Sequence, residues 1–249
     1  MAQQPQKYRL NDDCAVSTPQ LASLVFESNP VERERIVQKA RFPLVQTIVQ
    51  YAESKREIRR FLARNDGDTT ALAEARDHFD SLHEAETNEH VKLRHRLNRD
   101  AITAFLNQLS IHNFGKFDVV DAPSQMSTMI EGVRVKTTLD ALFQWTNKKG
   151  SAFSGGLMVF PAQSDTARQN IEERRTAMAT LIHWSLKAQG SNLPPAAKIC
   201  SVLDLADGQI VSSPETYARL ATRIEASCRY FASTFGVVAP PANYDGPLP

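Results

Sequence analysis

The sequence has few cysteines, no long apolar run and almost no net charge, and each absence excludes a class of protein. The chain has three cysteines, Cys14, Cys200 and Cys228. Their number is odd and no two of them form a CxxC pair, which argues against a disulfide partner or a zinc site. No apolar run approaches the roughly 18 residues of a membrane-spanning helix, so we expect no membrane partner. The formal net charge is +1, so no global field draws the chain to nucleic acid.

The N-terminal segment is polar and lacks the apolar stretch of a secretory signal, so we expect a cytoplasmic protein. The chain has 249 residues, of which 42% are hydrophobic and 23% are charged. This length is enough for one large domain or two small domains with a sizeable core.

The first part of the chain is predicted to be helical. Ser17 and Thr18 followed by Pro19 predict a helix start, because a hydroxyl residue caps the helix and proline fits its first turn. Pro30 opens a second helix, which Pro43 interrupts. Further helices are expected over about residues 44–64, before a turn at 65–68, and from about 69 or 70 to 109 with one break.

The character of the chain changes after residue 110. Residues 131–161 predict a β-hairpin that carries Asp140 on its first strand and turns at 147–150. The other elements are expected to be a short strand or loop at 117–120, a helix at 166–189, strands at 198–205 and 209–212, a helix at 215–235 and a flexible, proline-rich tail at 238–249.

This order of elements predicts an α+β or α/β fold, in which a helical N-terminal part packs on a small mixed β-sheet with flanking helices. Two divisions of the chain are compatible with it. Either a helical region at 1–110 precedes an α/β core at 111–237, or residues 18–237 form a single domain.

Asp140 and Glu89 are the candidate catalytic residues. A carboxylate beside a hairpin can bind a divalent metal, so Asp140 is also the candidate metal ligand, and a strand acid facing water is the alternative. Glu89 lies in an acidic stretch in which Glu86 and His90 share a helix face. No HExxH motif completes a ligand set, so a solvated helix face is the alternative there.

Three arginines are candidates for binding nucleic acid. Arg56, Arg60 and Arg64 are spaced by four residues, which places them along one face of a predicted helix. Such a stripe can follow phosphates, because each contact releases a counterion. The alternative is that neighbouring acids, Glu53 and Glu57, pair with these arginines.

Lys148 and Lys149, in the predicted hairpin turn, are two further candidates for binding nucleic acid, and an exposed turn without a ligand is the alternative. Gly155 and Gly156 follow on the second strand and permit a close backbone approach or a bulge. Trp145 is expected to lie in the core or in an interface. No phosphate-binding loop motif is present.

From about residue 84 onward, the order of elements resembles the PD-(D/E)XK nuclease-like superfamily, especially its RecB-like and CRISPR-associated branches. In that superfamily a helix precedes a β-hairpin whose first strand carries an Asp and whose second strand carries a (D/E)xK pair. Asp140 matches the Asp, and Leu203–Ser212 resembles a later hairpin. The whole chain is also similar to uncharacterised bacterial proteins with this layout.

The chain departs from this resemblance on the second strand, because residues 155–160 read Gly-Gly-Leu-Met-Val-Phe and lack both the second acid and the lysine. In this chemistry two carboxylates hold Mg²⁺ and the lysine helps to position the water. The resemblance therefore implies a degenerate, non-catalytic, nuclease-like module without a cofactor, which binds nucleic acid or a protein partner in a mobile-element, phage or defence system.

Two alternatives to the non-catalytic module remain open. One is an active metal-dependent nuclease with a migrated site, which would use Mg²⁺ held by Asp140 and acids such as Glu89. The other is a structural or protein-interaction subunit of a larger complex.

Overall fold

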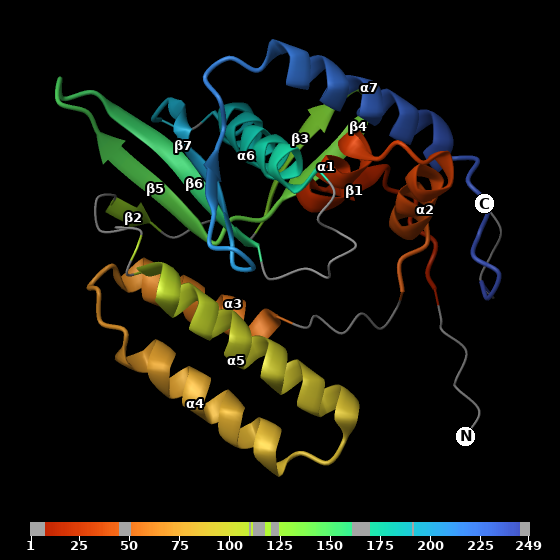
Figure 1. Cartoon of the computed structure of the whole chain (residues 1–249). Coiled ribbons are helices and arrows are strands. Elements are labelled where there is room, and N and C mark those ends of the chain that lie inside the picture. Colours follow the sequence, from red (N-terminus) through yellow and green to blue (C-terminus); the bar gives the residue numbers. More distant parts are fainter. Residues whose placement is uncertain are drawn as a thin grey trace.

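The computed structural model describes residues 8–44, 51–109, 111, 118–120, 125–160, 170–190 and 192–244. The predicted α+β class is confirmed, because the described helices surround two β-sheets (Figure 1). The sheet with strand order β2-β5-β6-β7-β8 has five strands, and the sheet with order β1-β4-β3 has three. No described helix has the length and apolar character needed to cross a membrane.

The helices are α1 (Thr18–Phe26), α2 (Pro30–Arg41), α3 (Ala52–Arg64), α4 (Thr70–Ala85), α5 (Glu89–Leu109), α6 (Ile171–Ala188) and α7 (Ala218–Phe235). The strands are β1 (Ala15–Ser17), β2 (Asp118–Val120), β3 (Met126–Ile130), β4 (Val133–Thr137), β5 (Ala141–Thr146), β6 (Ala152–Phe160), β7 (Pro195–Asp204) and β8 (Ile210–Ser212). The sequence did not indicate β1, and α3 begins at Ala52 and not at residue 44. Residues 45–50 lie outside the described residues.

In the five-stranded sheet, β6 and β7 are parallel and the other neighbours are antiparallel. The predicted close backbone approach at the glycine pair is confirmed, and the strand register shifts at this point. A Cβ atom on Gly155 would lie 2.3 Å from the carbonyl oxygen of Ile199, and one on Gly156 would lie 2.7 Å from Leu139 Cδ1. Glycine therefore lets β7 lie close against β6.

The three-stranded sheet corrects the predicted hairpin at 131–161. Glu131 and Gly132 form the two-residue turn between β3 and β4, with φ of 49° and 78°, as a type I′ turn requires. The first predicted strand is thus wrong, because β4 pairs with β1 and β3 while β5 pairs with β2 and β6. Asp140 lies between β4 and β5, where the chain passes from one sheet to the other. The predicted turn at 147–150 and the second strand are confirmed.

Three clusters of buried side chains form the core. The first, around Phe231, joins α1, α2, α7 and the three-stranded sheet. The second, around Phe105 and Leu203, joins α3 and α5 to one face of the five-stranded sheet, and the third packs α6 on the other face around Met178. Helices α1 and α2 therefore pack mainly in the first core, and α3 and α5 pack in the second. The predicted domain boundaries stay a prediction.

The segment after α7 packs against the first core for part of its length. Val238 is buried, and the ring of Tyr244 meets the ring of Phe42 edge-on at 4.9 Å between centroids. Gln38 Nε2 also donates a hydrogen bond to the carbonyl oxygen of Ala239 at 2.8 Å. These contacts differ from the flexible tail expected from residue 238, and residues 245–249 lie outside the described residues.

Candidate functional site

The Asp140 side chain is fully buried at the end of the five-stranded sheet where β6 and β7 finish. Lys55 Nζ lies 3.1 Å from Asp140 Oδ2, and Arg59 Nε donates a hydrogen bond to Oδ1 at 2.8 Å. The backbone N–H of Val159 donates to Oδ2 at 2.7 Å. Two cations of α3 and one backbone donor of β6 therefore hold this carboxylate.

Asp140 links α3 to the five-stranded sheet, because it also forms two hydrogen bonds with β6. The Asp140 N–H donates a hydrogen bond to the carbonyl oxygen of Leu157 at 2.8 Å. The Asp140 carboxylate accepts a second hydrogen bond from β6, from the N–H of Val159, which lies two residues closer to the end of the strand. The side chain thus takes the place of a backbone acceptor just before β5 begins, where a buried N–H needs a partner. The alternative that Asp140 is a strand acid facing water is wrong, because the residue is only 4% exposed.

A second buried ion pair lies at the same end of the sheet, where Asp204 ends β7. Arg175 of α6 donates from Nη2 to Asp204 Oδ2 at 2.6 Å and to Asp207 Oδ2 at 2.7 Å. Burial alone would lower the pKa of Arg175, but the hydrogen bonds to Asp207 and Asp204 outweigh it and raise the pKa. Both buried carboxylates at this end are therefore bound by cations.

The structure does not bring Glu89 close to Asp140. Ser54 contacts Asn98, and Phe61 contacts Phe105, so α3 and α5 run parallel with the same offset at both points. Glu89 begins α5 ten residues before the level of Lys55 and fourteen before that of Arg59, a distance of about 15–21 Å along the axis. In Figure 1 this start of α5 lies at the end of the α4–α5 pair that points away from the sheet.

The acidic stretch around Glu86 forms the turn between α4 and α5. Glu86 Oε1 accepts hydrogen bonds from the N–H groups of Thr87 and Asn88, both at 2.8 Å. These bonds, first that from Asn88, lower the pKa of the Glu86 carboxyl. The stretch thus has a structural role, and among the described residues no group of three or more His, Cys, Asp or Glu is placed to hold a metal ion.

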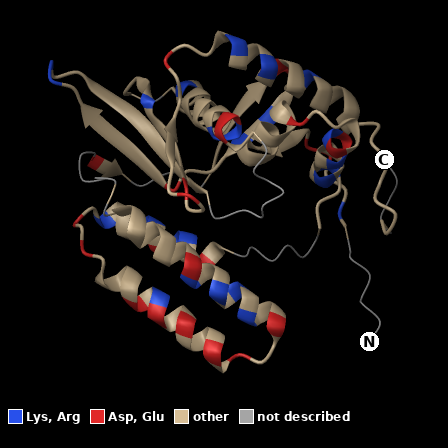
Figure 2. Ribbon diagram, in the orientation of Figure 1, with Lys and Arg blue, Asp and Glu red and all other residues tan. Residues whose placement is uncertain are grey.

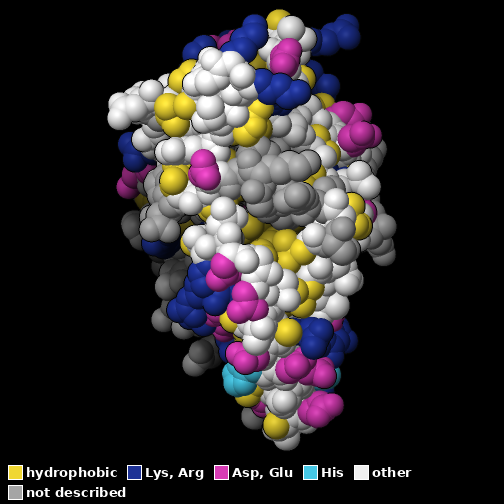
Figure 3. Space-filling model, turned by 90° about the vertical axis from the view of Figure 1, so that its left-hand side faces the viewer, with side chains coloured by type: hydrophobic (Ala, Val, Ile, Leu, Met, Phe, Trp, Pro, Cys, Tyr) yellow, Lys and Arg dark blue, Asp and Glu magenta, His cyan; other side chains and the backbone are white. Residues whose placement is uncertain are grey.

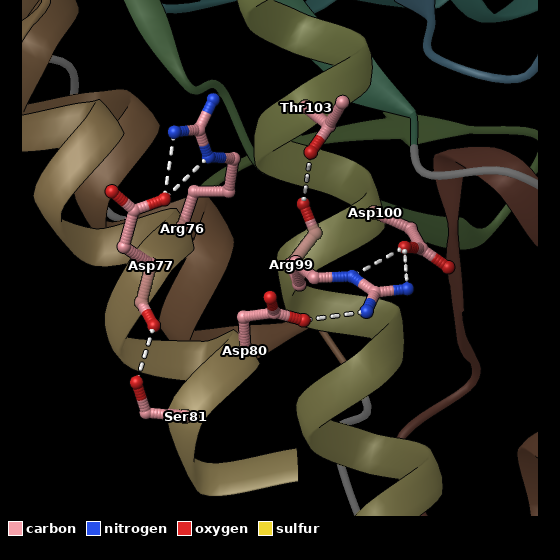
Figure 4. A network of polar contacts seen from close by, with 7 residues as sticks. All are labelled: Arg76, Asp77, Asp80, Ser81, Arg99, Asp100 and Thr103. Carbon is pink, nitrogen blue, oxygen red and sulfur yellow. Dashed lines mark hydrogen bonds and ion pairs between the residues drawn. The ribbon is translucent and has the colours of Figure 1, made fainter. Parts of the chain in front are cut away.

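Charged side chains of α4 and α5 pair with one another, both between the two helices and within each helix (Figure 4). Arg99 of α5 donates to Asp80 of α4 at 2.7 Å and to Asp100 at 2.8 Å, and these bonds raise its pKa. Arg76 pairs with Asp77 on α4. Acidic and basic side chains are accordingly mixed over the lower part of the molecule in Figure 3, which α3, α4 and α5 form.

The outward face of α3 keeps three exposed arginines. Arg56 and Arg60 are 61% and 65% exposed, and both contact the same carboxylate, that of Glu57, at 3.2 and 3.1 Å. The Arg64 side chain makes no hydrogen bond or ion pair within the part of the chain that the structure describes. Hydrogen bonds from Thr70 lower the pKa of Asp68, and the charge of Arg64 lowers it further. A groove of about 390 Å³ lies beside Arg60 and Arg64 and continues to Leu72 at the start of α4.

The β5–β6 turn presents Lys148 and Lys149 at a tip that projects from the sheet (Figure 2). Asn147 Oδ1 accepts hydrogen bonds from the N–H groups of Lys149 and Ser151 at 2.8 and 3.0 Å. Gly150 completes the turn with φ of 80°, a conformation that favours glycine. The two lysines are thus exposed on a turn whose backbone is held by hydrogen bonds.

Two aromatic residues and a third lysine lie beside this tip, and the sequence did not single out this combination. Trp145 and Phe153 oppose each other across β5 and β6, with ring centroids 5.9 Å apart, and both are partly exposed. The Nζ atom of Lys198, on β7, lies 4.4 Å from the centroid of the Trp145 ring. The available signal was the absence of Asp and Glu from residues 141–160 and 195–203.

The basic candidate residues therefore fall into two surfaces, the outward face of α3 and the tip of the β5–β6 hairpin. Asp140 is buried and Glu89 begins α5, so neither acid belongs to these surfaces. No protein-family model and no curated protein sequence matches this chain.

Proposed function

We propose that the chain is a non-catalytic, nuclease-like module that binds nucleic acid through exposed basic side chains. The observation that carries this proposal is the division of the cations on α3. Lys55 and Arg59 point inward and bind the buried carboxylate, whereas Arg56, Arg60 and Arg64 are exposed. One helix thus neutralises the acid that a nuclease would use and presents basic groups to solvent.

The non-catalytic part of the proposal is supported by the state of Asp140. Mg²⁺ binds to oxygen ligands in near-octahedral geometry, and it needs carboxylate oxygens that are free to coordinate it. Both oxygens of Asp140 already have partners. Oδ1 accepts a hydrogen bond from Arg59, and Oδ2 accepts one from the N–H of Val159 and forms an ion pair with Lys55. The glycine pair also stands where the superfamily carries its second acid, and any side chain on Gly155 would collide with Ile199.

The nucleic-acid part is supported by the spacing and exposure of the three arginines. Residues four apart on a helix are separated by about 6 Å along its axis, so Arg56, Arg60 and Arg64 form a linear array. Exposed ion pairs contribute only about 0–1 kcal/mol, so a phosphate can replace Glu57 as the partner of Arg56 and Arg60. The groove beside Arg60 and Arg64 provides space for that phosphate.

Fluorescence anisotropy with labelled single- and double-stranded DNA and RNA tests the proposal, at two salt concentrations and with or without Mg²⁺ or Mn²⁺. We expect salt-sensitive binding, no metal-dependent cleavage, and a weaker salt dependence after combined Arg56→Ala, Arg60→Ala and Arg64→Ala substitution. Replacing Lys39, an exposed lysine on α2, serves as the control. Cleavage that requires metal and is lost in an Asp140→Ala protein that circular dichroism shows to be folded would establish the nuclease, and an absence of binding would favour a protein-interaction subunit.

A further inference from the structure

We infer that the tip of the β5–β6 hairpin binds single-stranded nucleic acid. In this arrangement Trp145 and Phe153 stack on bases while Lys148, Lys149 and Lys198 contact phosphates. The inference rests on the proposed nucleic-acid binding, and it adds a second surface and a substrate class to that function. It stands on three features of the tip, namely its unpaired charge, its aromatic pair and its fixed backbone.

The charge of the tip is locally uncompensated. None of its three lysines forms an ion pair with a described residue. Residues 141–160 and 195–203, which include β5, β6 and nearly all of β7, contain no acid. The neighbouring edge strand β2 contributes Asp118, which lies opposite Gln144 and therefore on the ladder below the turn. A phosphate can approach these lysines without displacing a carboxylate, and each contact releases counterions.

The aromatic pair gives the tip a second means of binding nucleotides. The Trp145 and Phe153 rings are tilted by 32° to each other, and Lys198 covers Trp145 through a cation–π contact. An exposed contact of this kind is weaker than the stacking of a base on an aromatic ring. The phosphate of a nucleotide can therefore pair with Lys198. Its base can then stack on the face of Trp145 that Lys198 has left.

Aromatic stacking selects single strands, because the faces of bases in a duplex are covered by their neighbours. The hydrogen bonds from Lys149 and Ser151 to Asn147 hold the turn in one conformation, so little backbone freedom is lost on binding. Stacking does not distinguish one base from another, so we expect binding with little sequence preference.

The chain has two tryptophans, so the tryptophan fluorescence of the Trp184→Phe protein comes from Trp145 alone. We expect its emission to be quenched by 20-nucleotide oligo-dT or oligo-U and not by a 20-base-pair duplex, and the two single strands distinguish DNA from RNA. In the wild-type background, Trp145→Ala should weaken the binding of single strands about 10-fold, and Trp145→Phe should weaken it less. Combined Lys148→Ala, Lys149→Ala and Lys198→Ala substitution should reduce the salt slope by about 2.

Lys39→Ala is the matched control, and we expect its affinity and salt slope to equal those of the wild type. Salt-sensitive binding that survives in the tip variants and is lost in the α3 arginine variant would overturn this inference and leave the proposed function intact. An absence of binding by the wild-type protein would overturn both. Equal quenching by the duplex and the single strands would overturn the single-strand assignment.

Discussion

The two ends of the five-stranded sheet differ in whether their charged side chains are buried and paired or exposed. At the end where β6 and β7 finish, Asp140 and Asp204 are buried, and cations from α3 and α6 bind them. At the other end, Lys148 and Lys149 are exposed beside Trp145, in the turn of a hairpin that contains no acid. The first end uses its charges to hold the fold together, and the second leaves its charges available to a ligand.

Under the proposed function, the availability of the charges, and not their number, would distinguish the binding surface. In open sheets with parallel strands, ligands usually bind outside the carboxyl ends of the strands. Here that end carries the two buried ion pairs, and two of the three arginines on the outward face of α3, Arg56 and Arg60, share the carboxylate of Glu57. The hairpin tip has fewer cations than α3, but none of them is paired with a described residue.

The largest expected effect is the loss of stability on Arg175→Met. This substitution leaves the carboxylate of Asp204, which is 2% exposed, buried without its cation. Breaking a buried pair in this way typically costs about 3–5 kcal/mol of unfolding free energy. Urea denaturation measures the change, with Arg76→Met as the control, because Arg76 pairs with the exposed Asp77. Equal midpoints for the two variants would contradict a structural role for the buried end.

A smaller loss is expected for Gly155→Ala, at the middle of β6. The added Cβ meets the backbone carbonyl of Ile199, so β7 must move away from β6, at a cost of about 2 kcal/mol. The shift should also separate Lys198 from Trp145, which changes the tryptophan emission. Gly236→Ala is the control, because nothing lies within 4 Å of its Cβ and its φ of −74° suits alanine. Identical stability of the two variants would show that the strands are not in close contact.

The smallest effect should follow Glu57→Gln, which makes the outward face of α3 more like the hairpin tip. Arg56 and Arg60 lose their shared carboxylate, so we expect single- and double-stranded probes to bind about 2-fold more tightly at low salt. Anisotropy titrations measure the change. Glu74→Gln on α4 removes the same charge from another exposed position and controls for net charge. An equal gain in both variants would show that global charge, and not pairing on α3, limits binding.

Local signals in the sequence predicted most of the elements. The hydroxyl cap before Pro19, the proline at position 30 and the turn at 65–68 all mark helix boundaries that the structure confirms. In that turn Asn65 and Gly67 adopt φ of 49° and 74°. Such signals succeed because caps and tight turns depend on neighbouring residues and not on the rest of the fold.

The environment of Asp140 could not be predicted in the same way. Its cations, Lys55 and Arg59, lie more than 80 residues earlier in the chain, and the passage from β4 to β5 leaves one sheet for another. Local alternation of apolar residues gives no sign of that change. The contact between Lys198 and Trp145 was missed for the same reason, since it depends on the pairing of β6 with β7.

The most direct test of the central claim is the unfolding free energy of Asp140→Ala, measured by urea denaturation beside Asp118→Ala. Loss of the carboxylate leaves Lys55 and Arg59 without their partner and the Val159 N–H without an acceptor. We expect a loss of about 3 kcal/mol, near the lower limit for buried pairs because water reaches both cations, and a change below about 0.5 kcal/mol for the exposed Asp118. Unchanged or increased stability of Asp140→Ala would contradict the account and identify Asp140 as a carboxylate kept for function at the expense of stability.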